Sequence, residues 1–307
     1  MKQIICVLIG LLASISILTA QEFSSQDIAI NTHIDGTLLV PTQKTNSKLV
    51  ILIAGSGPTD RDGNQSFMKN DALKKLAEFL STSGIASFRY DKRIVKQIRT
   101  GNIDDDILFD DFVTDAKSVI EYFKSTYETI VVAGHSQGSL VGLLAVEAGA
   151  SAFISLAGPG KSIDAVIVDQ ISKTAPMFLE DTKRVLSVMR NGQTTADYPP
   201  ALASIFNLDI QPFMMNWMQY NPAQILSETS IPSLIISGTK DLQVGIEEAK
   251  LLQKNTQNGA LVIVENMNHV LVKIEGDDLE NAKSYNNKAL PIANEVTEAI
   301  LNFVNDL

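Results

Sequence analysis

Cysteine is almost absent from this sequence, and its absence excludes several kinds of site. The chain of 307 residues contains one cysteine, Cys6, which lies inside an apolar segment at the start of the chain. Once that segment is removed, the remaining chain can form no disulfide, no cysteine-based zinc site and no cysteine nucleophile. Cys6 is not at the end of the segment, so it offers no site for lipid attachment.

Apolar runs long enough to span a membrane are also missing. The apolar segment from Ile4 to Leu18 is shorter than the roughly 20 residues that a spanning helix needs. It follows the positive charge of Lys2 and precedes a short stretch ending at Ala20 that is typical of a cleavage site. We therefore expect residues 1–20 to be a secretory signal peptide, with export to the periplasm or the medium and no stable membrane insertion after cleavage near Ala20. An uncleaved anchor is the less favoured alternative.

Positive charge is scarce. Lysine and arginine number 25 against 35 aspartates and glutamates, which gives a net charge of -10. A phosphate surface would repel such a protein, so we expect no nucleic-acid partner. The hydrophobic share of 45% is ordinary for a globular protein, and the chain is long enough to bury a large core as one domain with or without an insertion.

Strand-like and helix-like segments alternate along most of the chain. After an N-terminal hairpin over residues 28–40, expected to turn at Asp35-Gly36, apolar runs predict strands at 49–53, 86–90, 129–133, 152–156, 233–237 and 261–264. Amphipathic patterns predict helices at 71–81, 109–126, 139–147, 246–254 and 292–303. This alternation predicts an α/β fold with a mostly parallel sheet flanked by helices.

The alternation stops between Lys161 and Glu228, where only helical patterns occur. The stretch is too long for a simple connection, so we expect a helical lid insertion (161–228) in a core made of residues 21–160 and 229–307. It holds five of the eight methionines and the only tryptophan, which are Met177, Met189, Met214, Met215, Met218 and Trp217. These side chains either line a substrate pocket, with Met214, Met215 and Trp217 as candidates, or pack the insertion onto the core.

The pentapeptide Gly134-His135-Ser136-Gln137-Gly138 matches the G-x-S-x-G pattern. It lies directly between a predicted strand and a predicted helix, and a reversal this tight needs small residues beside the serine. The turn projects the serine hydroxyl above the sheet edge, and the helix N-terminus behind it favours developing negative charge. The pattern therefore predicts Ser136 as a nucleophile.

A serine nucleophile needs a base, and the sequence has only three histidines. His33 lies in the predicted hairpin, far in sequence from the strand ends that face the site. His135 adjoins Ser136 on a sharp turn, where neighbouring side chains point apart, so we expect it to pack against the sheet. His269 follows the last predicted strand, at the edge where open α/β sheets build their sites, and is the predicted base.

The third member should be a buried carboxylate that holds the histidine tautomer. Asp241 follows the strand at 233–237, again at a carboxyl end. The order Ser136, Asp241, His269 is that of α/β hydrolases and differs from the orders of other serine-hydrolase folds. Asp164, beyond the preceding strand, is the alternative acid.

Hydrolysis also needs donors for the oxyanion. One should be the backbone N–H of Gln137, the residue after the nucleophile. The other should come from the glycine-containing loop after the strand at 49–53, with Ser56 as the first candidate and Gly57 as the second. The loop lacks the Gly-Lys-Ser/Thr ending of a phosphate-binding loop.

Several segments together resemble the bacterial α/β-hydrolase carboxylesterases, often described as serine aminopeptidase-like or generic hydrolases. They are Gly36-Thr-Leu-Leu-Val-Pro41, Gly55-Ser-Gly-Pro-Thr-Asp-Arg-Asp-Gly-Asn64, Tyr90-Asp-Lys-Arg93, Gly134-His-Ser-Gln-Gly138, Gly238-Thr-Lys-Asp-Leu-Gln-Val244 and Asn268-His269. The resemblance covers nearly all of the chain after residue 20, and it implies the triad Ser136, Asp241 and His269 with residues 161–228 as the lid. The family usually has Gly-x-Gly after Asp-Lys-Arg, where this chain has Ile94-Val-Lys96, so its substrate preference should differ. The charged residues Arg61, Asp62, Asp91 and Arg93 are expected to be structural ion pairs.

The expected function is that of a secreted serine hydrolase that cleaves carboxylic esters with short-to-medium acyl groups through an acyl-enzyme on Ser136. We expect a small-molecule ester as substrate, no cofactor and no metal. A peptidase acting on an N-terminal residue is one alternative, and it would need an acidic anchor such as Glu180 or Asp181 in the lid. A binding protein on an inactive hydrolase scaffold is the other.

Overall fold

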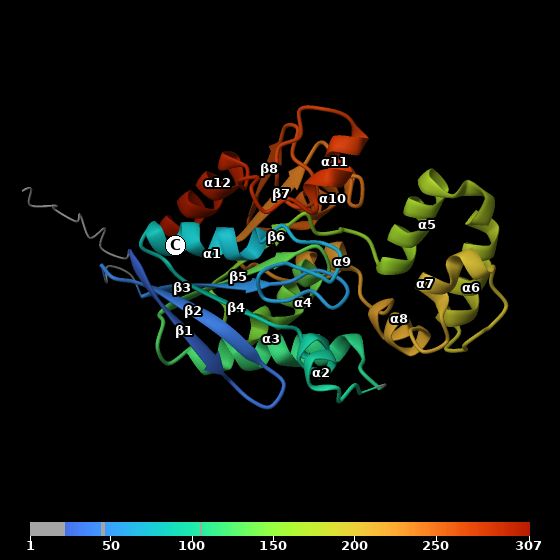
Figure 1. Ribbon diagram of the computed structural model, residues 1–307, viewed down its shortest axis with the longest axis horizontal. Helices are drawn as coiled ribbons and strands as arrows, with labels where there is room; N and C mark the ends of the chain where they lie inside the picture. Colours follow the sequence, from blue (N-terminus) through green and yellow to red (C-terminus); the bar gives the residue numbers. More distant parts are fainter. Residues whose placement is uncertain (1–21, 44–46, 105) are drawn as a thin grey trace, which may run out of the picture.

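The computed structural model describes residues 22–43, 47–104 and 106–307 (Figure 1). The predicted signal peptide, residues 1–20, lies outside the described residues. In the described part of the chain, no helix is both long and apolar enough to cross a membrane.

In the described part of the chain an eight-stranded sheet forms the centre, with the strand order β1-β2-β4-β3-β5-β6-β7-β8. The first two strands pair antiparallel and β2 also runs antiparallel to β4, whereas β3 to β8 are all parallel. The mostly parallel α/β sheet predicted from the sequence is therefore confirmed. The strands are β1 (Phe23–Ala29), β2 (Asp35–Pro41), β3 (Lys48–Ile53), β4 (Ala86–Tyr90), β5 (Thr129–His135), β6 (Ala152–Leu156), β7 (Ser233–Gly238) and β8 (Gly259–Val264).

Helices cover both faces of the sheet (Figure 1). On β3, Leu49, Ile51 and Ile53 enter one core cluster, whereas Val50 and Leu52 enter the other. This alternation is what a strand buried on both faces requires. One face is covered by α1 (Ala72–Thr82) and α12 (Asn294–Asn305), and the other by α3 (Phe109–Phe123), α4 (Gln137–Ala145) with the short η1 (Val146–Ala148), and α10 (Ile246–Asn255).

The N-terminal hairpin is present, but the predicted turn position is wrong. The chain turns at residues 30–34, where the Asn31 side chain accepts hydrogen bonds from the backbone N–H groups of His33 and Ile34. Asp35 and Gly36 instead begin β2. Glycine is needed at position 36 because a Cβ there would come within 2.2 Å of the Phe88 ring. The close approach of a neighbouring strand, and not a turn, explains this glycine.

Residues 161–228 connect β6 to β7 and are helical, without a strand, as the sequence predicts. They form α5 (Ile163–Thr174), η2 (Pro176–Phe178), α6 (Leu179–Arg190), η3 (Pro200–Leu202), α7 (Ala203–Phe206), α8 (Gln211–Trp217) and α9 (Pro222–Ser227). Figure 1 shows α5 to α8 to the side of the sheet, with α9 returning toward the core.

Two helices were not predicted from the sequence, α2 (Arg93–Thr100) and α11 (Asp278–Ser284). The residues Ile94-Val-Lys96, which replace the Gly-x-Gly of similar proteins, belong to the first turns of α2. These residues therefore lie in a helix that follows β4 almost directly.

Candidate active site

A strained turn carries Ser136 between β5 and α4. Its φ of 53° and ψ of -120° lie where residues other than glycine are rarely found. A Cβ on Gly134 would lie 2.0 Å from the carbonyl oxygen of Gly138, and one on Gly138 would lie 2.5 Å from that of Ile53. Both flanking glycines are thus required by close backbone approach, and the sharp strand-to-helix turn that the sequence predicts is present.

His269 and Asp241 form a buried pair. Nδ1 of His269 lies 2.7 Å from Oδ2 of Asp241, and both side chains are almost fully buried. The other carboxylate oxygen, Oδ1, accepts hydrogen bonds from the backbone N–H groups of Gln243 and Val244 at 2.8 and 2.9 Å. A carboxylate held in this way keeps the proton on Nδ1 and leaves Nε2 of His269 able to accept one.

A buried asparagine, Asn268, shapes the loop that carries His269. Its side-chain oxygen accepts from the backbone N–H groups of Val270 and Val272, and its Nδ2 donates to Asn281 and Ser284 of α11. The side chain of Asn281 in turn donates to the carbonyl of Lys240, next to Asp241. Helix α11 therefore ties the histidine loop to the aspartate loop, a role that the sequence did not reveal.

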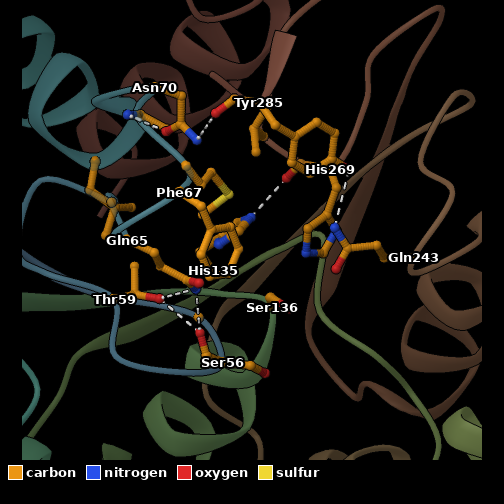
Figure 2. Close-up of a pocket in the computed structure, with 16 residues that line it drawn as sticks. Ser56, Thr59, Gln65, Phe67, Asn70, His135, Ser136, Gln243, His269 and Tyr285 are labelled. Carbon is orange, nitrogen blue, oxygen red and sulfur yellow. Dashed lines mark hydrogen bonds between the residues drawn. The ribbon is translucent and has the colours of Figure 1, made fainter. Parts of the chain in front are cut away.

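A cavity of about 280 Å³ contains both Ser136 and His269. Figure 2 shows Ser56, Thr59, Gln65 and Phe67 on one side of it and His269, Gln243 and Tyr285 on the other. Among the described residues, no hydrogen bond links the Ser136 hydroxyl to His269. In apo structures such catalytic hydrogen bonds are often long and tighten only when substrate binds.

The loop after β3 lies against this turn. A Cβ on Gly55 would be only 3.2 Å from Cβ of Ser136, and Ser56 lines the cavity. The carbonyl of Ser56 accepts hydrogen bonds from the hydroxyl of Thr59 and the amide of Gln65, which hold the loop in place. Gln137 begins α4, so its backbone N–H has no acceptor within the helix.

Known proteins are similar to this chain in sequence or in fold. Esterase EstD from Thermotoga maritima is 24% identical over 268 residues, which are 83% of this chain and 62% of EstD. The chain thus spans less than two thirds of the length of this curated relative. Among solved structures, Est1E from Butyrivibrio proteoclasticus superposes with a TM-score of 0.58 at 19% sequence identity. A proline iminopeptidase from Mycobacterium smegmatis superposes with a TM-score of 0.56 at 12% sequence identity. Each superposition covers 92% of this chain and 98% of the solved chain. By fold, the chain is an α/β hydrolase. The resemblance to bacterial α/β-hydrolase esterases is confirmed, although no protein-family model matches the chain.

His135 of this α/β hydrolase does not pack against the sheet in the way the sequence suggested. It lines the cavity, with Nε2 2.8 Å from the carbonyl oxygen of His269 and the two ring centroids 4.8 Å apart. Burial, together with the neighbouring His269, lowers the pKa of His135 to about 4. A neutral His135 therefore donates to the His269 backbone, while His33 is exposed in the hairpin turn.

The alternative acid, Asp164, has a different partner. It lies in α5 and accepts a hydrogen bond from Nε of Arg190 at 2.6 Å. Burial alone would raise the pKa of Asp164, but hydrogen bonds from Ser162 and Arg190 outweigh it and lower that pKa. The geometry thus selects Asp241, and not Asp164, as the neighbour of His269.

The predicted roof of Met214, Met215 and Trp217 over Ser136 is not what the structure has. Trp217 stacks on Phe109 of α3 with ring centroids 5.4 Å apart and an interplanar angle of 2°. Met214 and Trp217 are buried in the same core cluster, Met215 packs against it, and none of the three lines the cavity beside Ser136. The alternative reading, in which they anchor the insertion to the core, fits their positions.

The charged residues after β3 and β4 are paired below the site, as the sequence suggested. Arg61 binds Asp91 at 2.8 Å, and Arg93 binds Asp115 at the same distance. Asp62 likewise accepts from Arg89. The Arg61–Asp91 and Arg89–Asp62 pairs hold the loop that carries Ser56, whereas Arg93–Asp115 joins α2 to α3. None of these charged residues lines the cavity beside Ser136 and His269.

Proposed function

We propose that this chain hydrolyses carboxylic esters through an acyl-enzyme formed on Ser136. The observation that carries the proposal is the buried Asp241–His269 pair beside the cavity that also contains the strained Ser136. The similarity to EstD supports an ester as the substrate class.

The mechanism follows from the positions of these groups. Nε2 of His269 takes the proton of Ser136 as Oγ attacks the ester carbonyl carbon, and Asp241 stabilises the imidazolium that results. The negative charge of the tetrahedral intermediate is bound by the backbone N–H groups of Ser56 and Gln137. The intermediate expels the alcohol, which takes the proton from His269. Water then attacks the acyl-enzyme by the same steps and releases the carboxylic acid.

The cavity favours small acyl groups. Its volume of about 280 Å³ is near the lower end for ligand pockets, which span about 300–1,000 Å³. Its wall combines the apolar side chains of Phe67 and Met68 with polar groups such as Gln65 and Gln243. We expect short-to-medium acyl chains to be cleaved best, with residues 161–228 as the helical lid insertion beside the core.

The peptidase alternative lacks a suitable anchor. Glu180 pairs with Lys183 and Asp181 with Arg184 on the surface of α6. Neither acid lines the cavity beside Ser136. An N-terminal amine bound there would therefore find no carboxylate from the residues suggested by the sequence.

The test compares three substrate classes on the purified chain without residues 1–20. We expect hydrolysis of p-nitrophenyl acetate and butyrate with falling kcat/KM toward octanoate, and little hydrolysis of aminoacyl anilides. The Ser136→Ala variant is the matched control for background hydrolysis. Higher kcat/KM on the anilides would favour the peptidase, and no turnover of any substrate would favour a binding protein on an inactive scaffold.

Under the same proposal, the protein is exported and residues 1–20 are removed. The measurement is the intact mass of material isolated from the periplasm or medium of the host. The expected mass corresponds to a chain that begins at Gln21. A mass that begins at Met1, with the protein in the membrane fraction, would contradict export by cleavage and favour an anchor.

A further inference from the structure

A buried lysine, Lys92, connects the two segments that carry the proposed oxyanion donors. It follows β4 and is only 6% exposed. Its Nζ donates to the carbonyl oxygen of Gly55 at 3.0 Å and to Oε1 of Gln137 at 2.7 Å. Nζ also lies 4.2 Å from the centre of the Phe112 ring. The mechanism above assigns no role to this residue.

The contact with Gly55 bears directly on Ser56. The carbonyl of Gly55 and the N–H of Ser56 belong to the same peptide group, and the described peptide bonds are all trans. In a planar trans peptide the C=O and N–H point in opposite directions. A hydrogen bond from Lys92 to the Gly55 oxygen therefore fixes the peptide plane, with the Ser56 N–H directed away from Lys92.

The second contact acts on the other donor. Gln137 begins α4, and its backbone N–H is the other proposed oxyanion donor. Its side chain is buried, with Oε1 held by Nζ of Lys92. One ammonium group thus joins the loop after β3 to the first residue of α4, and the separation of the two donors depends on it.

The charge of Lys92 is unusual for a structural residue. Among the described residues, no carboxylate forms an ion pair with it, and its partners are a carbonyl, an amide oxygen and an aromatic face. Burial of an ammonium group without a counter-ion is unfavourable, although a cation–π contact offsets part of that penalty. Burial accordingly lowers the pKa of Lys92 to about 7.

A developing oxyanion would supply the missing negative charge. The tetrahedral intermediate places a charge beside the N–H groups of Ser56 and Gln137, and fixed positive charge near that position lowers the barrier most in a site shielded from water. A negative charge nearby also favours the protonated form of a lysine. The unpaired cation is therefore better matched to the transition state than to the free protein.

Resting on the proposed function, we propose that Lys92 is a positioning residue that holds both oxyanion donors in place and supports the oxyanion with its charge. It does not touch the substrate, so it acts through the Ser56 and Gln137 peptide groups. Its loss should affect the transition state much more than the ground state.

The first test replaces Lys92 with methionine, which keeps the length of the side chain and its packing on Phe112. In other serine hydrolases, removing one oxyanion donor lowers kcat by about 100- to 1,000-fold. Lys92→Met keeps both backbone donors and disturbs only their positions, so we expect a smaller loss of kcat, about 10- to 100-fold. KM should stay within about threefold, because the change removes an interaction specific to the transition state. The control is Lys117→Met, an exposed lysine paired with Glu147, which should keep normal kcat.

A transition-state analogue separates positioning from general damage. A trifluoromethyl ketone forms a tetrahedral adduct with the serine and puts its oxygen in the oxyanion site. Its inhibition constant should rise in Lys92→Met by the same factor as kcat/KM falls. The melting temperature checks that the variant folds, because the change leaves the Gly55 carbonyl and Oε1 of Gln137 without their donor. Normal kcat in a folded Lys92→Met variant would overturn the inference, as would equal weakening of ground-state and transition-state binding.

A second variant tests the same bridge from the other end, in case Lys92→Met does not fold. Gln137→Met keeps the backbone N–H but removes the acceptor for Nζ, and it should lower kcat by a smaller factor with unchanged KM. Unchanged kcat in this variant would overturn the bridge to Gln137. The wild-type chain serves as the reference for the proposed function. If it cleaves no ester, the proposed function fails; if it does and both variants match it, only the role of Lys92 fails.

Discussion

Replacing Asp241 with asparagine should disable the proposed catalysis without disturbing the fold. The change keeps the size of the side chain and exchanges one oxygen for an NH₂ group. Two backbone N–H groups, of Gln243 and Val244, point at Oδ1, so the asparagine oxygen should stay there. The NH₂ group must then face Nδ1 of His269, at the position where Oδ2 now lies 2.7 Å away.

This arrangement selects the wrong tautomer of His269. An NH₂ donor requires an unprotonated Nδ1, which leaves the proton on Nε2 and removes the base that Ser136 needs. In the triad of a serine protease the same exchange lowers kcat about 10⁴-fold, and we expect a loss of that order here. At about 1.36 kcal/mol per factor of ten, this loss corresponds to an activation free energy that is higher by about 5.4 kcal/mol. The matched control is Asp164→Asn, which lies on α5 and should keep nearly normal kcat.

The assay is kcat for p-nitrophenyl butyrate, with the melting temperature as a check on folding. A kcat within tenfold of wild type in a folded Asp241→Asn variant would refute this reasoning. A severe loss in Asp164→Asn with a mild one in Asp241→Asn would place the acid one strand earlier than the structure indicates.

Two further predictions concern stability. Trp217→Ala should lower the free energy of unfolding by about 3–5 kcal/mol, because it removes the ring stacked on Phe109. The preference among ester chain lengths should stay unchanged. Urea unfolding measures the first effect and a series of p-nitrophenyl esters the second, and a changed preference would show that Trp217 contacts the acyl chain. Burial would raise the pKa of Asp91, but hydrogen bonds from Arg61 and Arg99 outweigh burial and lower it. Its contribution to stability is therefore present above the ordinary aspartate pKa of about 3.9 and is lost as the pH falls toward the folded value. Asp91→Asn should be less stable than wild type at neutral pH, with a difference that shrinks below about pH 4; a difference that does not depend on pH would contradict the ion-pair explanation.

Much of the architecture could be predicted because the parallel sheet imposes strong local patterns. The buried strands are short apolar runs, and their carboxyl ends meet at one edge of the sheet, which is why Ser136, Asp241 and His269 could be proposed as a group from separate segments. The glycines beside Ser136 carried a further signal, since the close approach of backbone at Gly138 admits no side chain.

Features that depend on contacts between distant segments could not be predicted. His135 was expected to point away from the site, yet it bonds to the carbonyl of His269, 134 residues later. An apolar partner for Trp217 was expected whether it lined a substrate pocket or packed the insertion onto the core. Only the position of α8 against α3 shows that this partner is Phe109. Lys92 looked like one more charge in an Asp-Lys-Arg run, because nothing local distinguishes an unpaired buried lysine from its ion-paired neighbours.

The most direct test of the central claim is covalent labelling of the nucleophile. The purified chain without residues 1–20 is treated with a fluorophosphonate, and intact mass and peptide mapping locate the adduct. One adduct per chain on Ser136, absent from Ser136→Ala and strongly slowed in His269→Ala, is the predicted result. Labelling that persists in Ser136→Ala, or an adduct on any other residue, would contradict the assignment of Ser136 as the nucleophile.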